Sequence, residues 1–503
     1  MSEEIKSNSS AAQSNAVASD AIAMHPISAP QSRKDEPIQR VLKRYLIAIR
    51  GIGKTAQIAL PHITQWNNSE IDKVQKKIKK FLPGLPAKGD GRKTFTLESA
   101  RDFAEFTGTI RKLEELRSHD STAVLAKSLF TQLFAEFDAY IGELLKVVYI
   151  KNDKLLKGIS REISLTDLLD FEDLNAVKLA MLEKEIETFR RDSYIEQFST
   201  LEKKFNLTLK KFKEWPEFVE LSQRRNILTH NGGMVSDQYL VVCAKEGHKF
   251  LSKPKIGDPL GVTYEYYANA SRLLSKVGLM LAYTLWSKVF PDESDLIHTG
   301  LNDTIFNALQ QERWRFVSEL EDFVLSDQMR KGISDIDLRI RIINASIGIK
   351  FSGEDPGVEK LLNSVDWSAS YRDFKLATSV LNERYEDAIV IMKSIGKRGE
   401  IISQTDYHTW PLFHRFRERP EFYDAYFEIY GEAFAEKVEV DKGSVEAHAK
   451  TTDNRIAAKS RSKVIDVEIN APKFAKSKQH EAETAKKVRK STEPIAIKKS
   501  KPL

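Results

Sequence analysis

The sequence contains a single cysteine, Cys243, among 503 residues. One thiol cannot form an intrachain disulfide or a multi-thiolate metal site, and this usage is typical of a reducing cytoplasm. Apolar runs are also short: the longest uncharged one, Val277–Trp286, is well below the roughly 20 residues that span a bilayer. The N-terminal residues lack the apolar core of a secretion signal. We therefore expect a cytoplasmic protein without membrane contact.

Signatures of metal and nucleotide sites are weak. His408 and His414 do not have the i, i+4 spacing of zinc ligands on a helix. Ala48–Thr55 fits a loose phosphate-loop pattern, with alanine in place of the first glycine. A true phosphate loop follows a buried strand, whereas Val41–Ile49 has the pattern of a helix. We expect no metal and no cofactor.

The net charge of the body of the chain is close to zero. The formal net charge of +6 comes from 78 basic and 72 acidic side chains. Residues 441–503 contain 16 basic and 8 acidic side chains, which leaves 62 against 64 for residues 1–440. A basic tail on a near-neutral body is not the pattern of a nucleic-acid-binding domain.

The length of the chain suits two or three domains. Residues 1–35 are rich in Ser, Ala, Asn and Gln and are expected to be disordered. Residues 36–117 predict a helical lead-in, residues 118–292 a helical bundle, and residues 300–435 a series of short paired helices. The Lys- and Ala-rich residues 441–503 predict a disordered basic tail. The expected fold is all-α.

Apolar residues recur at helical spacing through the first half of the chain, most clearly over Ser121–Ile150. Further helices are expected over residues 40–55, 70–81, 165–174, 176–192, 195–205, 216–231 and 268–290. Tyr239–Cys243 and Val262–Tyr266 are rich in β-forming residues and flank a stretch with Lys, Gly and Pro. This pattern predicts a small hairpin.

A possible repeat follows. Glu312-Arg-Trp314 is echoed by Glu383-Arg-Tyr385, and 383 − 312 = 71 residues is about two periods of a 34-residue helical repeat. Phe374–Ile395 resembles a degenerate tetratricopeptide repeat (TPR), and Trp410–Phe422 resembles a terminal capping helix. Such repeats stack and leave a surface for partners. An ordinary helical bundle is the alternative.

The segment Trp215–Gly233 predicts a helix with polar side chains at its end. Asn226 and His230 are four residues apart and share one face, while Arg225 follows the apolar face. An imidazole can exchange a proton with a ribose 2′-hydroxyl, and a guanidinium can stabilise phosphate charge in the transition state. These groups suit phosphodiester chemistry. The alternative is structural, with His230 on the helix carbonyls and Arg225 in an internal salt bridge.

Arg225-Asn226-Ile-Leu-Thr-His230 resembles the Arg-polar-x-x-x-His motif of the HEPN superfamily, and Gln223–Gly233 is similar to its bacterial members. The resemblance covers roughly Ser118–Phe290. It implies an α-helical bundle that dimerises so that two motifs face each other. Active members are metal-independent endoribonucleases, frequently toxins or abortive-infection effectors against phage, whereas others have lost catalysis and serve as scaffolds.

A further candidate is Asp138, which lies in the apolar stripe of the long helix, where a lone carboxylate is costly. In the family an acidic or polar group from this helix often approaches the motif, so Asp138 resembles that partner. An ion pair with Arg225 is compatible with this role.

The sequence thus predicts a dimeric, metal-independent endoribonuclease. His230 is the expected general acid or base, Arg225 the phosphate binder, and Asn226 and Asp138 the orienting groups. RNA is the expected substrate, the HEPN-like domain the homodimer interface, and the TPR-like repeats the site of a protein partner. A toxin or phage-defence role follows from the resemblance alone. The alternative is a catalytically inactive HEPN–TPR scaffold.

Overall fold

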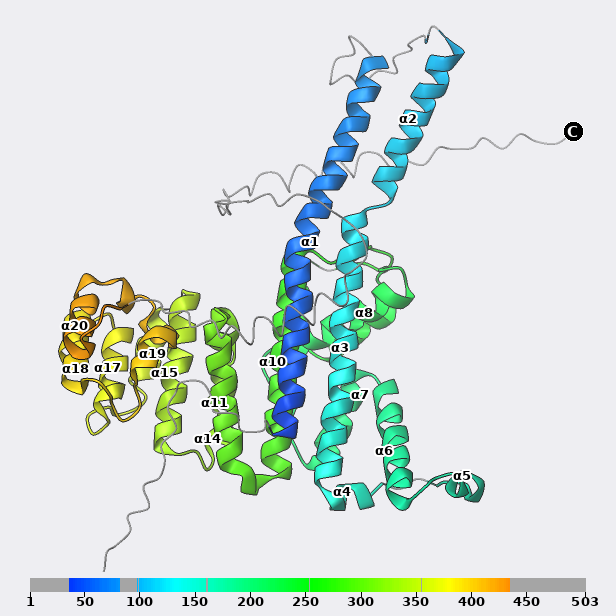
Figure 1. Ribbon diagram of the computed structural model, residues 1–503. Helices are drawn as coiled ribbons and strands as arrows, with labels where there is room; N and C mark the ends of the chain where they lie inside the picture. Colours follow the sequence, from blue (N-terminus) through cyan, green and yellow to red (C-terminus); the bar gives the residue numbers. More distant parts are fainter. Residues whose placement is uncertain are drawn as a thin grey trace, which may run out of the picture. The chain divides into compact units, whose positions relative to one another are not determined.

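The computed structural model describes residues 36–81, 97, 99–159, 162–252, 254–353 and 355–434. The disorder expected for residues 1–35 and 441–503 lies outside these residues. The described chain is mostly helical and contains no strand, which confirms the all-α fold (Figure 1). Its extended segments pair only at a single bridge between Met234 and Pro259.

Three long helices form the centre of the described structure. They are α1 (Pro37–Phe81), α3 (Ser121–Lys151) and α10 (Tyr264–Val289). Tyr45 joins all three: its ring stacks on that of Tyr140, with centroids 4.2 Å apart, and its hydroxyl donates to the Leu274 carbonyl at 2.8 Å. Tyr140 donates in turn to the Gly278 carbonyl at 2.7 Å. Both buried tyrosine hydroxyls therefore have backbone acceptors on α10 within the packed contact of the three helices.

The shorter helices of the first part are α2 (Ala100–Ser118), α4 (Asp153–Lys157), α5 (Leu165–Leu169), α6 (Leu174–Arg191), α7 (Tyr194–Phe205), α8 (Trp215–His230) and α9 (Asp237–Lys245). Helices α6 and α8 both contact α3, and α9 packs on α8. The α3 helix, which carries Asp138, is thus held beside the helix of the Arg–His motif.

Helix α1 is longer than the sequence pattern indicates. The expected helices over residues 40–55 and 70–81 are parts of one continuous helix that passes through Pro61. A proline inside a helix costs about 3 kcal/mol. Ala56 and Leu60 are buried in the common core just before Pro61, and this burial offsets the cost.

The expected hairpin is wrong. Tyr239–Cys243 belongs to α9, and Val262–Tyr266 leads into α10. Ser236 caps α9 by accepting the Tyr239 N–H at 3.2 Å, and Thr263 caps α10 in the same way. These caps, with Tyr239 and Cys243 buried one helical turn apart, outweigh the β propensity of the intervening residues.

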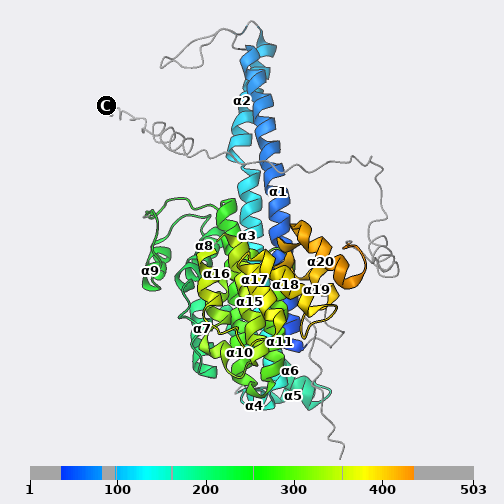
Figure 2. The same ribbon diagram turned by 90° about the vertical axis from the view of Figure 1, so that its left-hand side faces the viewer.

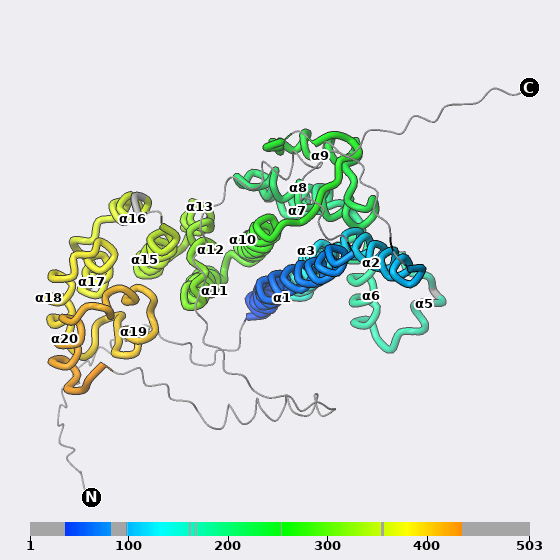
Figure 3. The backbone as a smooth tube through the Cα atoms, turned by 90° about the horizontal axis from the view of Figure 1, so that it is seen from above, coloured from blue at the N-terminus to red at the C-terminus, as the bar shows by residue number. Residues whose placement is uncertain are grey.

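The second part consists of short helices. They are η1 (Pro291–Glu293), α11 (Ser294–Gln310), α12 (Trp314–Glu319), α13 (Glu321–Val324), α14 (Asp327–Arg330), α15 (Asp335–Ser352), α16 (Asp355–Leu362), α17 (Arg372–Leu381), α18 (Tyr385–Ile395), α19 (Gln404–Thr409), η2 (Pro411–Phe413), η3 (Phe416–Glu418) and α20 (Pro420–Tyr430). In Figures 1 and 3, α11, α15, α17 and α18 follow one another away from α10, each in contact with the next. One apolar core continues from α10 into these helices, and the domain division between residues 292 and 300 stays a prediction.

The two echoed segments form the same turn. Glu312 joins α11 to α12 at φ +56°, and Glu383 joins α17 to α18 at φ +57°. The residue after each glutamate donates its N–H five residues back, from Arg313 to Ala308 at 3.0 Å and from Arg384 to Ser379 at 2.9 Å. The sequence echo therefore corresponds to a repeated helix–turn–helix geometry.

Candidate functional site

Helix α8 begins and ends as its sequence predicts. Pro216 lies in its first turn, and Asn231 at its end donates its N–H to the Ile227 carbonyl at 2.9 Å. Gly232 and Gly233 follow in the left-handed region, at φ +60° and +83°. A Cβ on Gly233 would lie 2.9 Å from the Leu260 carbonyl oxygen, so this glycine lets the backbone of the α9–α10 segment approach the end of the motif helix.

The structure brings Asp138 of α3 to Arg225 of α8. An Oδ2 of Asp138 lies 3.4 Å from a terminal nitrogen of Arg225, and the two side chains are 20% and 28% exposed. Tyr194, the first residue of α7, donates its hydroxyl to Oδ1 of Asp138 at 2.5 Å. Burial raises the pKa of Asp138, and the Tyr194 hydrogen bond and the Arg225 charge offset part of this rise. The motif arginine is thus anchored from two neighbouring helices.

Arg225 is held in place, but not all of its N–H donors have a partner among the described residues. Its other terminal nitrogen donates to the Asn226 side-chain oxygen at 3.1 Å, which links the first two motif residues. Its Nε–H is buried and has no partner among the described residues. A guanidinium has five N–H donors, so this one keeps donor capacity for a further acceptor.

His230 occupies the last position of α8 and is exposed. It forms no hydrogen bond or ion pair with a described residue. It lies five residues beyond Arg225, about 7.5 Å along the helix axis. Asp138, Arg225 and Asn226 therefore form a connected set, and His230 is separate from it at the exposed C-terminal end of the helix.

Sequence reasoning missed Tyr194 and a buried cluster around Glu220. The Glu220 carboxylate accepts from Tyr239 and Tyr266, both at 2.6 Å, and from the Nε of Arg224 at 2.8 Å. Arg224 also donates to the Gly261 carbonyl at 3.1 Å and lies over the Tyr266 ring. Glu220 and Arg224 are an i, i+4 pair on α8, and this spacing was the available signal. The cluster ties α8, α9 and α10 together.

Other sequence candidates have structural explanations. Residues 48–55 lie inside α1, where their backbone N–H groups belong to the helix and do not form a phosphate cradle. Burial raises the pKa of Cys243 to about 12, so the thiol stays protonated and unreactive. Among the residues that the structure describes, no three His, Cys, Asp or Glu side chains are arranged to hold a metal. None of the described helices has the length and apolar content of a membrane span.

Comparison of the chain with protein-family models, with curated proteins and with solved structures finds no match. The functional interpretation therefore depends on the residues of the site.

Proposed function

We propose that this protein is a metal-independent endoribonuclease with Arg225 and His230 as its catalytic residues. The observation that carries the proposal is the environment of Arg225. Asp138 and Asn226 orient its guanidinium, and the side chain remains 28% exposed. An exposed imidazole lies at the end of the same helix. A hydrogen-bond donor for phosphate and a proton-transfer group are thus on one rigid helix.

The proposed reaction is a transesterification within RNA. One imidazole removes the proton of the ribose 2′-hydroxyl, and the 2′-oxygen attacks the adjacent phosphorus. The bond from phosphorus to the 5′-oxygen breaks, and an imidazolium protonates the leaving oxygen. The products are a 2′,3′-cyclic phosphate and a 5′-hydroxyl. Arg225 binds the non-bridging oxygens and stabilises the charge that they gain in the transition state.

Two histidines are needed at once, one as base and one as acid. Each chain supplies one in the motif, so a homodimer with facing motifs would provide the pair. The exposure of His230 is compatible with this arrangement because the imidazole is open to a second copy. Asp138 and Asn226 act through Arg225 and are positioning residues.

The short helices after α10 are proposed to be TPR-like repeats that bind a protein partner. The equal turns at Glu312 and Glu383 support a repeated unit. A toxin or phage-defence role is proposed by analogy with the HEPN superfamily. It predicts that expression in a bacterial host arrests growth and that His230→Ala abolishes the arrest.

The deciding experiment is cleavage of total RNA in the presence of EDTA. The wild type is expected to give fragments with 2′,3′-cyclic phosphate ends. His230→Ala and Arg225→Ala are each expected to lower the rate at least 100-fold, the usual size of an acid–base or electrostatic contribution.

Matched controls are His119→Ala and Arg191→Ala, which replace an exposed histidine just after α2 and an exposed arginine at the end of α6. Both should cleave like the wild type. Equal background cleavage by all five proteins would refute the enzyme and favour the scaffold, whose interfaces would then carry the function. Sedimentation of each variant checks that it still dimerises.

A further inference from the structure

The second half of α1 has few contacts with the rest of the described structure. In Figures 1 and 2 it runs beside α2, past the end of α10. After Pro61, only Val74 of α1 is buried, and Leu113 is the only buried residue of α2. The ring of Phe81 meets that of Phe106 edge-on near the end of the pair. Most side chains on this half of α1 are therefore open to solvent.

This half of α1 is basic. Residues 62–81 contain five lysines against Glu70 and Asp72, so the segment carries a net charge of +3 within a body that is neutral overall. Lys73, Lys76 and Lys80 follow one another at spacings of three and four, and Lys79 extends the same face. Lys73 pairs with Glu70. Lys76, Lys79 and Lys80 are exposed and form no ion pair with a described residue.

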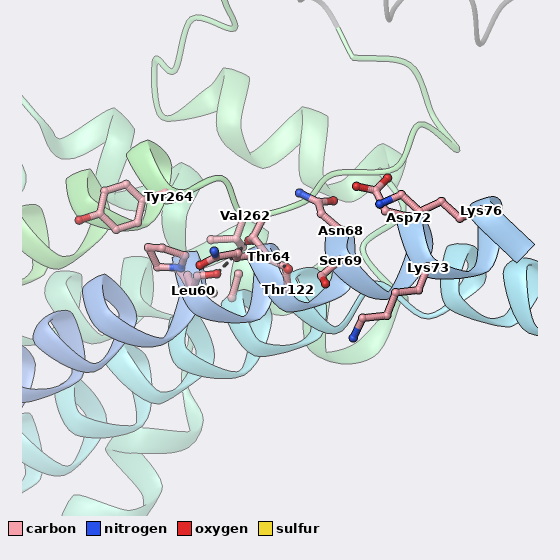
Figure 4. Close-up of a pocket in the computed structure, with 13 residues that line it drawn as sticks. Leu60, Thr64, Asn68, Ser69, Asp72, Lys73, Lys76, Thr122, Val262 and Tyr264 are labelled. Carbon is pink, nitrogen blue, oxygen red and sulfur yellow. Dashed lines mark hydrogen bonds between the residues drawn. The ribbon is translucent and has the colours of Figure 1, made fainter. Parts of the chain in front are cut away.

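The lysine face continues into a hollow of about 780 Å³. Its lining residues come from α1, α3, the start of α10 and the segment just before it (Figure 4). The lining residues are Leu60, Pro61, Thr64, Gln65, Asn68, Ser69, Asp72, Lys73 and Lys76 of α1, Thr122 and Ala126 of α3, and Val262 and Tyr264. Most of the lining surface is apolar, with hydroxyl and amide groups of Thr64, Gln65 and Asn68 among it, and Tyr264 is 51% exposed at its edge. Such a lining offers hydrogen bonds to sugars and base edges, and one aromatic ring for stacking.

A short segment of backbone connects the hollow to the Arg–His motif. Val262 lines the hollow, and Leu260, two residues earlier, donates its N–H to the Gly233 carbonyl at 2.8 Å. Gly233 is three residues beyond His230. At no more than about 3.6 Å per residue, the backbone at the edge of the hollow lies within roughly 21 Å of the His230 backbone.

We propose that the hollow and the lysine face of α1 bind single-stranded RNA and lead it to His230. The phosphates lie along Lys76, Lys79 and Lys80, and one or more bases enter the hollow beside Tyr264. The path to His230 rests on the proposed ribonuclease function, whereas RNA binding by the face does not. The charge of the face matches a polyanion, Glu70 is paired with Lys73, and Asp72 is the carboxylate that lines the hollow.

The test measures binding of a fluorescein-labelled, mixed-sequence 20-nucleotide RNA by the full chain carrying His230→Ala, which blocks cleavage. Adding Lys76→Ala, Lys79→Ala and Lys80→Ala is expected to weaken binding about tenfold at 0.15 M salt. The slope of log affinity against log salt should fall in magnitude by about 2, or 0.7 for each lost contact. The control removes three exposed lysines elsewhere, Lys154, Lys178 and Lys184, and should bind like the parent.

A second variant guards against misfolding as an explanation. Asp72→Asn removes the opposing charge and should strengthen binding several-fold, a gain that damage to the fold would not give. Equal affinities for the two triple variants, or no gain with Asp72→Asn, would overturn the proposal. Cleavage by the wild type that depends on His230 but is unaffected by the loss of the α1 lysines would do the same and leave the ribonuclease standing. RNA binding that requires these lysines, without cleavage of any RNA, would keep the binding face and refute the enzyme.

Discussion

Asp138 is held among groups that act on its charge in opposite directions. Burial disfavours the carboxylate, while Tyr194 and Arg225 favour it, and the net effect is a raised pKa. A carboxyl group with a pKa above its unfolded value binds protons more tightly in the folded state. Its ionisation therefore lowers stability as pH rises from about 4, the unfolded value, through the folded pKa.

Asp138→Asn should reveal this sign because Asn keeps the shape and cannot ionise. The melting temperature of the variant relative to the wild type is expected to increase between pH 4 and pH 7. Glu196→Gln should show the opposite trend, since hydrogen bonds from Ser193 lower the pKa of Glu196. A flat difference between Asp138→Asn and wild type would mean that Arg225 and Tyr194 fully compensate for burial.

At the scale of single residues, the sequence was informative where a charged side chain occupied a position in an apolar pattern. A carboxylate in an apolar stripe and an arginine on an apolar face each needed a partner, and the structure pairs them. Tyr194 was not predictable as the second partner because a tyrosine at a helix start conflicts with nothing. Glu220 is likewise a carboxylate with apolar neighbours, Val219 and Leu221, and its tyrosine partners come from α9 and α10.

At the scale of the elements, the contact between α1 and α10 depends on a missing side chain. Gly278 of α10 faces the Tyr45 ring, and a Cβ at this position would overlap the ring. Tyr45 cannot move away easily, since its hydroxyl is held by the Leu274 carbonyl and its ring by Tyr140.

Gly278→Ala is therefore expected to destabilise the protein by about 1–3 kcal/mol, the usual cost of overpacking a core. Gly108→Ala on α2 is the control. No atom lies within 4 Å of its added methyl group, and alanine should stabilise the exposed helix by up to about 1 kcal/mol. Chemical denaturation measures both. Equal effects from the two substitutions would show that α1 and α10 have room to separate.

Helix positions followed from apolar periodicity, and α8 is within one residue of its expected bounds. The prediction of a hairpin failed because it depended on local composition alone. Residues 239–243 have strand composition, but the element is set by the Ser236 cap and by what Tyr239 and Cys243 pack against. Thr263 capped the next helix in the same way. Propensity over five residues is a smaller effect than a cap together with tertiary burial.

For the whole molecule, the charge average hides a local concentration. Residues 1–440 are near neutral, yet the second half of α1 carries lysines without an ion pair among the described residues, beside a hollow of about 780 Å³. The basic residues 441–503 then have a different expected role, attraction of RNA at low salt rather than chemistry.

Deleting residues 441–503 should leave the cleavage rate at saturating RNA unchanged. At subsaturating RNA the truncated chain should be slower in low salt, and the difference should shrink as salt is added. Initial rates over a salt series measure this. Loss of all cleavage by a truncated chain that melts and dimerises like the full one would show that the tail takes part in catalysis.

The sequence by itself indicated the all-α fold and most of the helices before residue 290, because periodicity and helix ends are local properties of the chain. It also placed the Arg–His motif at the end of a helix. Only the tertiary structure decided which helices are neighbours. The arrangement of the helices pairs Asp138 with Arg225, brings Tyr194 to Asp138, and buries Glu220. It also brings residues of α3 and α10, about 60 and 200 positions after Leu60, to the hollow beside α1. The reason is physical: each of these contacts depends on side chains from separate elements being desolvated together, and the packing of the whole chain determines which ones meet.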